Sequence, residues 1–206
     1  MHEKYTTCGF VLFASAYREA DKIISIYTED FGLVSAVASG VRRSASKLRY
    51  HTQDFSVRRF SLVRGCDLWR LVGAEEIADV IGIDPKTSSE SLAVYARVLS
   101  LIRRLVRGQE KNERVFSSLF SLYRLLAQAS DDENTNSSEI ANTDLAALET
   151  LSVFRILYSL GYIKSDATTE PLISTAEIGL GQVALAKPLV PSLISAINAG
   201  LTESHL

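Results

Sequence analysis

The sequence has few of the residues from which covalent frameworks and metal sites are built. It contains two cysteines and three histidines in 206 residues. Two cysteines exclude a framework of several disulfides, and they cannot supply a four-cysteine zinc site. The histidines His2, His51 and His205 are not spaced to bind one metal ion or to serve a catalytic triad. We therefore expect neither a metal ion nor a cofactor.

Sequence motifs of common enzyme classes are also missing. There is no glycine-rich phosphate loop, no nucleophile elbow and no helix with paired histidines. The adjacent carboxylates Glu75–Glu76 and Asp131–Asp132 are expected on a solvated surface, where neighbouring side chains do not converge on one point. We therefore predict a binding protein without catalytic residues.

Long apolar runs are absent as well. The N-terminal stretch MHEKYTTCGF lacks the charged-then-apolar layout of a signal peptide. No stretch reaches the about 18 consecutive apolar residues that a membrane-spanning helix needs. We expect a soluble, cytoplasmic protein, and its apolar content of 47% can fill a hydrophobic core.

Charge is distributed unevenly along a chain whose formal net charge is only −2. Residues 40–70 hold eight Lys or Arg against two acidic residues, and residues 97–124 hold seven against two. After residue 124 the balance reverses to three against ten. Such asymmetry favours a polyanionic or acidic partner for the basic regions and says nothing about the fold.

Before about residue 82 the sequence is typical of a small β-barrel or sandwich, because short apolar or alternating runs are separated by polar turns. The expected strands span 6–14, 22–28, 32–40, 54–63 and 67–77. In the fourth strand Val57 and Phe60 have opposite parity, which predicts a β-bulge at Arg58–Arg59. Residues 1–82 are thus predicted to form one β-domain.

From residue 83 to residue 206 we expect a helical domain, which makes the fold class α+β. Apolar residues at steps of three and four, together with capping and terminating residues, predict four helices. They span 87–108, about 112–126, about 142–161 and 189–199. The polar stretch 130–142 is predicted to be a loop or disordered. Residues 162–187 show no clear period, with room for a short strand at 182–185.

The clearest candidate for a binding site is the sequence GVRRSASKLR at residues 40–49, which we name the basic segment. It places Arg42, Arg43, Lys47 and Arg49 on small residues without an acidic neighbour. Such a composition suits phosphate contact, because backbone N–H groups can also approach the phosphates. The same pattern also fits a solvated turn. Further cations on the neighbouring strands are Arg58, Arg59, Arg64 and Arg70.

Three aromatic residues near this basic region are candidates for stacking on bases: Tyr17, Tyr50 and Phe60. Taken alone, each of them is more commonly a residue of the core.

A second basic region, within residues 97–124, is either a solvated helix face or a site for an acidic peptide with an apolar end. The candidate residues for that peptide site are Arg103, Arg104, Arg107 and Arg124.

The stretch from residue 16 to residue 56 resembles the amino-terminal signature of the RecO family of bacterial recombination mediators. The resemblance is carried by Tyr17, by the run Glu19, Ala20, Asp21, by Gly32 and by the sequences ASGVRRSASKLR and DFS. The sequence LGY at 160–162 resembles the helical part of the family. The resemblance implies a five-stranded OB-fold followed by a helical domain.

The resemblance also implies a function without turnover. Members of the family bind single- and double-stranded DNA, anneal complementary strands, contact the C-terminal tail of single-strand-binding protein, and act with RecR to load the RecA recombinase in the bacterial cytoplasm, on the nucleoid during repair. Their DNA contacts come from basic OB-domain residues, which match Arg42, Arg43, Lys47 and Arg49 here. Many members have a four-cysteine zinc site after LGY, and this sequence has no cysteine there.

Two other functions remain open from the sequence. One is a protein-interaction adaptor whose positive charge is incidental, which the acidic C-terminal half favours. The other is an RNA-binding OB protein, because the same basic segment would contact either nucleic acid.

Overall fold

The computed structural model describes residues 3–77, 88–128 and 144–203. The chain divides into two compact units. The barrel unit comprises Met1–Val80 and Leu99–Asn112, and the helical unit comprises Ile81–Val98 and Glu113–Leu206. The polar stretch 130–142 lies outside the described residues, as do His2, Asp131–Asp132 and His205.

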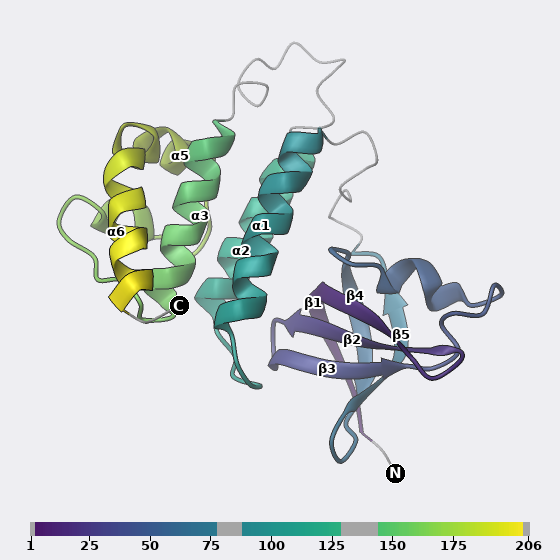
Figure 1. Cartoon of the computed structure of the whole chain (residues 1–206). Helices are drawn as coiled ribbons and strands as arrows, with labels where there is room; N and C mark the ends of the chain where they lie inside the picture. Colours follow the sequence, from purple (N-terminus) through teal and green to yellow (C-terminus); the bar gives the residue numbers. More distant parts are fainter. Residues whose placement is uncertain (1–2, 78–87, 129–143, 204–206) are drawn as a thin grey trace. The chain divides into compact units, whose positions relative to one another are not determined.

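Five strands close a barrel in the barrel unit (Figure 1). They are β1 (Lys4–Tyr17), β2 (Asp21–Thr28), β3 (Gly32–Ala38), β4 (Val57–Val63) and β5 (Trp69–Glu75). Their order around the barrel is β1-β2-β3-β5-β4, and β4 pairs with β1 to complete it. Only the β3–β5 pair is parallel among these five pairings. This is the OB-fold, and the predicted five-stranded barrel is confirmed.

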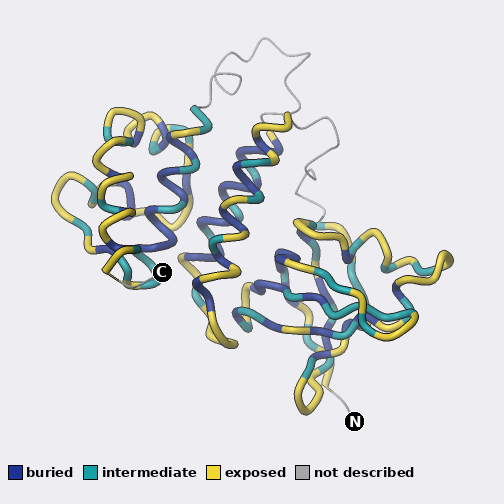
Figure 2. The backbone as a smooth tube through the Cα atoms, in the orientation of Figure 1, coloured by how far each residue is buried: buried dark blue, intermediate teal, exposed yellow. Residues whose placement is uncertain are grey.

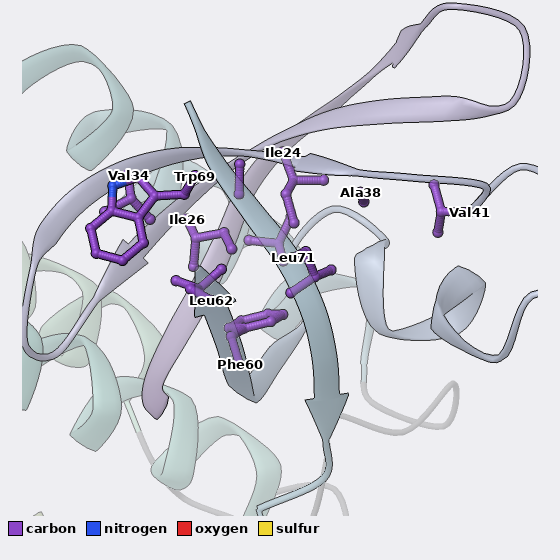
Figure 3. Packing of buried hydrophobic residues seen from close by; sticks show 11 residues of the cluster. Ile24, Ile26, Val34, Ala38, Val41, Phe60, Leu62, Trp69 and Leu71 are labelled. Atoms are coloured by element: carbon purple, nitrogen blue, oxygen red, sulfur yellow. The ribbon is translucent and has the colours of Figure 1, made fainter. Parts of the chain in front are cut away.

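The barrel interior is filled by apolar side chains from all five strands (Figure 3). They alternate with residues of the outer face, as the period of two in a strand requires. The large members that share this core are Val11, Ile24, Ile26, Val34, Phe60, Leu62, Trp69 and Leu71. Figure 2 shows the contrast between these buried strand positions and the exposed loops that join the strands.

The predicted bulge at Arg58–Arg59 is wrong. Strand β4 pairs with β1 in continuous register from Val57 to Val63. The change of parity has another cause, because the start of β4 is buried on both of its faces. Val57, which pairs with Phe10 on the outer face, is 2% exposed, while Phe60 fills the interior.

Register shifts occur elsewhere in the barrel. One lies in β1 between Val11 and Phe13, and the other lies in the β4–β5 pair between Ser61 and Leu62. Such shifts bend a strand and let a small barrel close. The first of them also changes which residues of β1 face outward.

The segment 99–112 packs against the barrel as part of the same unit. The Leu33 N–H donates a hydrogen bond to the carbonyl of Gly108 at 3.2 Å. The approach is close at Gly32, whose φ is 62° and where a Cβ would lie 2.3 Å from the carbonyl oxygen of Glu110. A side chain at residue 32 would therefore separate the segment from the start of β3.

The remaining elements are helical, and the four helices predicted from the sequence are present. The helices are α1 (Ser89–Leu105), α2 (Glu113–Gln128), α3 (Leu145–Ser159), α4 (Glu170–Ile173), α5 (Leu180–Ala186) and α6 (Val190–Glu203), with 3₁₀ turns η1 (Lys47–Thr52) in the barrel unit and η2 (Lys187–Leu189) before α6. In the helical unit α3 packs against α2, α5 and α6. Side chains of Ser88 and Asp144 accept from backbone N–H groups at the starts of α1 and α3.

Two details of the C-terminal part differ from the sequence expectation. The expected strand at 182–185 is wrong, because these residues lie in α5. At the start of this helix the Gly179 N–H donates to Gln182 Oε1 at 2.9 Å, and the side chain of Val183 is buried. Gly200 does not end α6. A Cβ there would lie 2.7 Å from the Tyr162 carbonyl oxygen, so the glycine permits close packing.

The stretch Leu180–Glu203 is long and apolar enough, by composition alone, to cross a membrane, and 17% of its most apolar window is buried. It contains Lys187 and two prolines, and its residues belong to α5, η2 and α6. Core helices of soluble proteins can be equally long and apolar, so this single stretch supports no conclusion about a membrane.

Arg155 in α3 organises the connection between α4 and α5. Its side chain is 4% exposed, and its guanidinium donates to the carbonyls of Leu172, Thr175, Ala176 and Glu177. Burial lowers the pKa of Arg155 below its usual value, and the charge of Arg114 acts in the same direction. This one cation thus donates to four backbone carbonyls within residues 172–177.

We expect the substitution Arg155→Met to lower the free energy of unfolding by about 3 kcal/mol, because it removes the donor from the buried Leu172 carbonyl and from the partly buried carbonyls of Thr175 and Ala176. Urea denaturation followed by far-UV circular dichroism measures this loss. The control is Arg97→Gln, which removes an exposed pair with Glu149 and should cost less than about 1 kcal/mol. Equal small losses in the two variants would contradict the role given to Arg155.

Candidate nucleic-acid interface

The basic segment connects β3 to β4 at one end of the barrel. It begins at Gly40, whose φ of 66° lets the chain turn, and it runs into η1. The four cations predicted from the sequence, Arg42, Arg43, Lys47 and Arg49, are all exposed. The structure thus places them together on one surface connection of the barrel unit.

Hydrogen bonds anchor the start of the basic segment to the β1–β2 turn, residues 18–20. The Gly40 N–H donates to the carboxylate of Asp21 at 2.7 Å. The Arg42 N–H donates to the Ala20 carbonyl at 2.9 Å, and its guanidinium donates to two further carbonyls of the turn at 3.2 and 2.9 Å. Arg42 therefore holds the segment in place as well as contributing charge.

The other three cations of the segment have no such role. The side chains of Arg43, Lys47 and Arg49 form no hydrogen bond or ion pair within the part of the chain that the structure describes. Arg43 and Arg42 line an open pocket of about 260 Å³ together with Glu19 and Ala20. These three cations are available to an anionic ligand.

The strand arginine Arg58 is engaged inside the barrel unit. Its Nε donates to Nδ1 of His51 at 3.1 Å, and its guanidinium donates to the Val57 carbonyl at 2.7 Å. A long contact of 3.9 Å joins it to Glu76. Only 21% of the side chain is exposed. Arg58 therefore mainly stabilises η1 through His51 and presents little charge to solvent.

Two further predicted cations, Arg59 and Arg64, are exposed. Arg59 lies opposite Cys8 in the β1–β4 pair. Burial raises the pKa of the Cys8 thiol, and a hydrogen bond from Arg59 opposes that effect only in part. Arg64 follows β4 and lies over the ring of Trp69, 5.9 Å from its centroid. Arg70 is exposed on β5.

The three predicted stacking aromatics lie in different environments. Phe60 is 0% exposed in the barrel core, so the structure corrects its assignment: its ring has no face to offer to a base. Tyr50 is 70% exposed in η1. Tyr17 is half-buried at the end of β1, with the guanidinium carbon of Arg18 5.0 Å from its ring centroid.

Sequence reasoning missed two exposed aromatic rings. Phe13 in β1 is 37% exposed, and Phe55 before β4 is 39% exposed. Phe13 follows the register shift in β1, which changes its parity, and no signal in the apolar run 10–14 indicates that shift. Phe55 has a φ of 68°, which ordinary strand residues do not adopt.

The arginines predicted for an acidic peptide are divided between the two units. Arg103 lies over Phe13 in the barrel unit, with its guanidinium carbon 4.1 Å from the ring centroid. Arg104 and Arg107 are exposed in the same unit. Arg124 belongs to the helical unit, where it forms an ion pair with Glu177 at 2.9 Å.

Among the residues that the structure describes, no group of three or more His, Cys, Asp or Glu side chains is placed to hold a metal ion. The basic segment and its surroundings offer cations, backbone N–H groups and aromatic rings. Cations and N–H groups suit contact with phosphates, and aromatic rings suit stacking on bases.

Comparison with known proteins identifies the barrel unit. The family model described as "Recombination protein O N terminal" matches residues 1–79. The chain is 33% identical over 116 residues to the DNA repair protein RecO of Rubrobacter xylanophilus, covering 56% of this chain and 46% of the relative. The RecO of Synechocystis is 31% identical over 123 residues, covering 60% of this chain and 43% of the relative.

A third relative, the RecO of Pelotomaculum thermopropionicum, is 31% identical over 127 residues, covering 60% of this chain and 47% of the relative. The chain thus spans about half the length of the curated relatives it matches. The family match over residues 1–79 and the relatives with this one name support the assignment of the chain to the RecO family.

Proposed function

We propose that this chain is a DNA repair protein of the RecO type that binds DNA by the basic segment and has no catalytic step. The observation that carries this proposal is the set of three exposed cations, Arg43, Lys47 and Arg49, which lack partners in the described part of the chain. A polyanion can neutralise all three without breaking an existing ion pair. The names of the relatives support a role in DNA repair.

The anchoring of the basic segment favours binding. Flexible cations lose conformational freedom when they contact phosphates, and that loss opposes association. Here Arg42 and the Gly40 N–H already fix the start of the segment to the β1–β2 turn. The start of the segment therefore loses less conformational entropy on binding DNA, and its backbone is held where phosphates can approach it.

Annealing follows from the same electrostatics. Two single strands repel each other through their phosphates, and a surface that neutralises part of this charge lowers the repulsion. Cations of the basic segment, together with the exposed Arg59 and Arg64, supply that surface on one unit. The proposed activity is therefore the pairing of complementary strands at the barrel, with Arg42 as its structural support.

The partners of the whole family are part of this proposal. We include binding to the acidic, apolar-ended tail of single-strand-binding protein, action with RecR, and loading of recombinase. Of the four arginines first expected to bind the tail, Arg103 and Arg124 already contact Phe13 and Glu177. Arg104 and Arg107 are the exposed members without a partner in the described residues, so we assign the tail to them.

The DNA-binding proposal is tested by fluorescence anisotropy of a labelled single-stranded oligonucleotide across a salt series. We expect the variant Arg43→Ala, Lys47→Ala, Arg49→Ala to bind more weakly than the wild type. The slope of log affinity against log salt should become shallower by about 2, since each phosphate contact contributes about 0.7.

The matched control removes three cations that the structure places in ion pairs, by Arg97→Gln, Arg124→Gln and Lys187→Gln. It should retain the wild-type slope. Wild-type binding without salt dependence, or equal slopes in both variants, would instead support the protein-interaction adaptor. Tighter binding of ribose than of deoxyribose oligonucleotides would favour the RNA-binding alternative.

Substitutions of Arg42 and Arg43 should separate an effect on stability from an effect on DNA binding. We expect Arg42→Ala to lower the free energy of unfolding of the barrel by about 1 kcal/mol, through loss of its hydrogen bonds to the turn. Arg43→Ala should change it by less than about 0.5 kcal/mol and weaken DNA binding. Urea denaturation followed by the fluorescence of Trp69, the single tryptophan, reports on the barrel. Equal stability of the two variants would remove the structural role of Arg42.

The tail assignment is tested by titration with an acidic peptide that ends in apolar residues. The variant Arg104→Glu, Arg107→Glu should lose most of its affinity for the peptide, because attraction becomes repulsion at both positions. Lys164→Glu, a charge reversal in the helical unit, serves as the control. Unchanged affinity in the double variant would exclude these two arginines from the peptide site.

A further inference from the structure

We propose that the outer face of β1 carries a stacking site for unpaired bases, formed by Phe13 with Arg103 and by Tyr17 with Arg18. We name these four residues the β1 platform. Its ligand is single-stranded DNA with accessible bases. The inference rests on the proposed DNA-binding function and adds to it a surface that distinguishes single strands from duplexes.

The strand register places both rings on the same face. After the shift between Val11 and Phe13, the side chain of Ala14 packs against the barrel core. Because side chains alternate along a strand, Phe13, Ser15 and Tyr17 point to the outer face. The small side chain of Ser15 lies between the two rings along the strand.

Each ring of the platform has a guanidinium beside it. The guanidinium carbon of Arg103 is 4.1 Å from the Phe13 ring centroid, and that of Arg18 is 5.0 Å from the Tyr17 ring centroid. Bases stack on aromatic rings and on guanidinium planes alike. A ring with an arginine over it therefore offers an extended stacking surface that also carries positive charge.

The platform continues directly into the basic segment. Arg18, which lies over the Tyr17 ring, accepts a hydrogen bond at its carbonyl from the Arg42 guanidinium at 3.2 Å. Along β1 the two rings are four residues apart, which corresponds to about 13 Å of strand. A single strand that contacts the basic segment with its phosphates can thus lay successive bases along β1.

The outer face is closed beyond Phe13. Phe10 pairs with Tyr27 on this face, and both are 0% exposed. The Tyr27 hydroxyl donates to the Asn112 carbonyl at 3.4 Å, so the segment 99–112 covers this part of the sheet. Phe13 and Tyr17 therefore follow this covered part of the face along β1, toward the turn that holds the basic segment.

Duplex DNA cannot use the platform, because its bases are stacked on one another and only its phosphates and groove edges are accessible. The basic segment, by contrast, contacts the phosphates of either form. The two surfaces are therefore expected to respond differently to the form of the DNA. That difference allows the platform to be tested apart from the phosphate contacts.

The test uses the full chain and the variant Phe13→Leu, which keeps an apolar side chain and removes the aromatic ring. Affinity for a single-stranded oligonucleotide should fall about tenfold. Affinity for a duplex of the same length should stay unchanged. The control is Phe120→Leu in the helical unit, the same change at a ring stacked on Phe116, and it should bind both forms as the wild type does.

An oligonucleotide that contains 2-aminopurine reports stacking directly. Its fluorescence should be quenched on binding to the wild type and less so with Phe13→Leu. Arg103→Lys keeps the charge and removes the guanidinium plane, so it should weaken single-strand binding while the salt slope is unchanged. If Phe13→Leu binds single strands with wild-type affinity and quenching, the stacking proposal is wrong, and the proposed phosphate contacts of the basic segment are unaffected. Absence of salt-dependent DNA binding in the wild type would overturn both.

Discussion

The closure of the β-barrel by the β4–β1 pair is the constraint on which the rest of the barrel unit depends. Five short strands close only if some of them bend, and the register shifts in β1 and in the β4–β5 pair supply the bends. The shift in β1 has a consequence beyond closure, because it changes the parity of every residue that follows. Phe13 faces outward and Ala14 faces the core as a result. The same geometry that closes the core therefore decides which aromatic rings reach the surface.

The basic segment illustrates how one cation is used to position others. Arg42 is tied to the β1–β2 turn by its guanidinium, whereas Arg43, Lys47 and Arg49 have no partner within the described residues. A segment with four free cations would be more mobile and would lose more entropy on binding. The net charge of −2 says nothing of this arrangement, because what a phosphate experiences within a Debye length is the local charge.

The sequence was sufficient to predict the five strands, the four longer helices and the exposure of the basic segment. Period, capping residues and turn residues are local signals, and each of these features depends on them. The directions of Phe13 and Phe60 were not predictable, because they depend on strand register. The direction of Phe13 follows from a shift within the β1–β2 hairpin, and that of Phe60 from the pairing of β4 with the distant β1. The sequence likewise did not indicate that Arg58 and Arg124 have partners. Tertiary structure brings His51 to Arg58 and Glu177 to Arg124. Helix α5 was missed because seven residues are too few to establish a period.

The connection between α4 and α5 shows how a segment without cysteines can be ordered. A four-cysteine zinc site would supply four strong bonds from one centre to the chain around it. In this chain Arg155 also makes four bonds from one centre, because its planar guanidinium donates to four backbone carbonyls from one buried position. A guanidinium has five donors in a fixed fork and remains charged when buried, so it can satisfy carbonyls that point inward from a turn. A lysine at this position has three donors on one atom and could not reach carbonyls spread over residues 172–177. The order of this part of the helical unit thus depends on the shape of one side chain as much as on its charge.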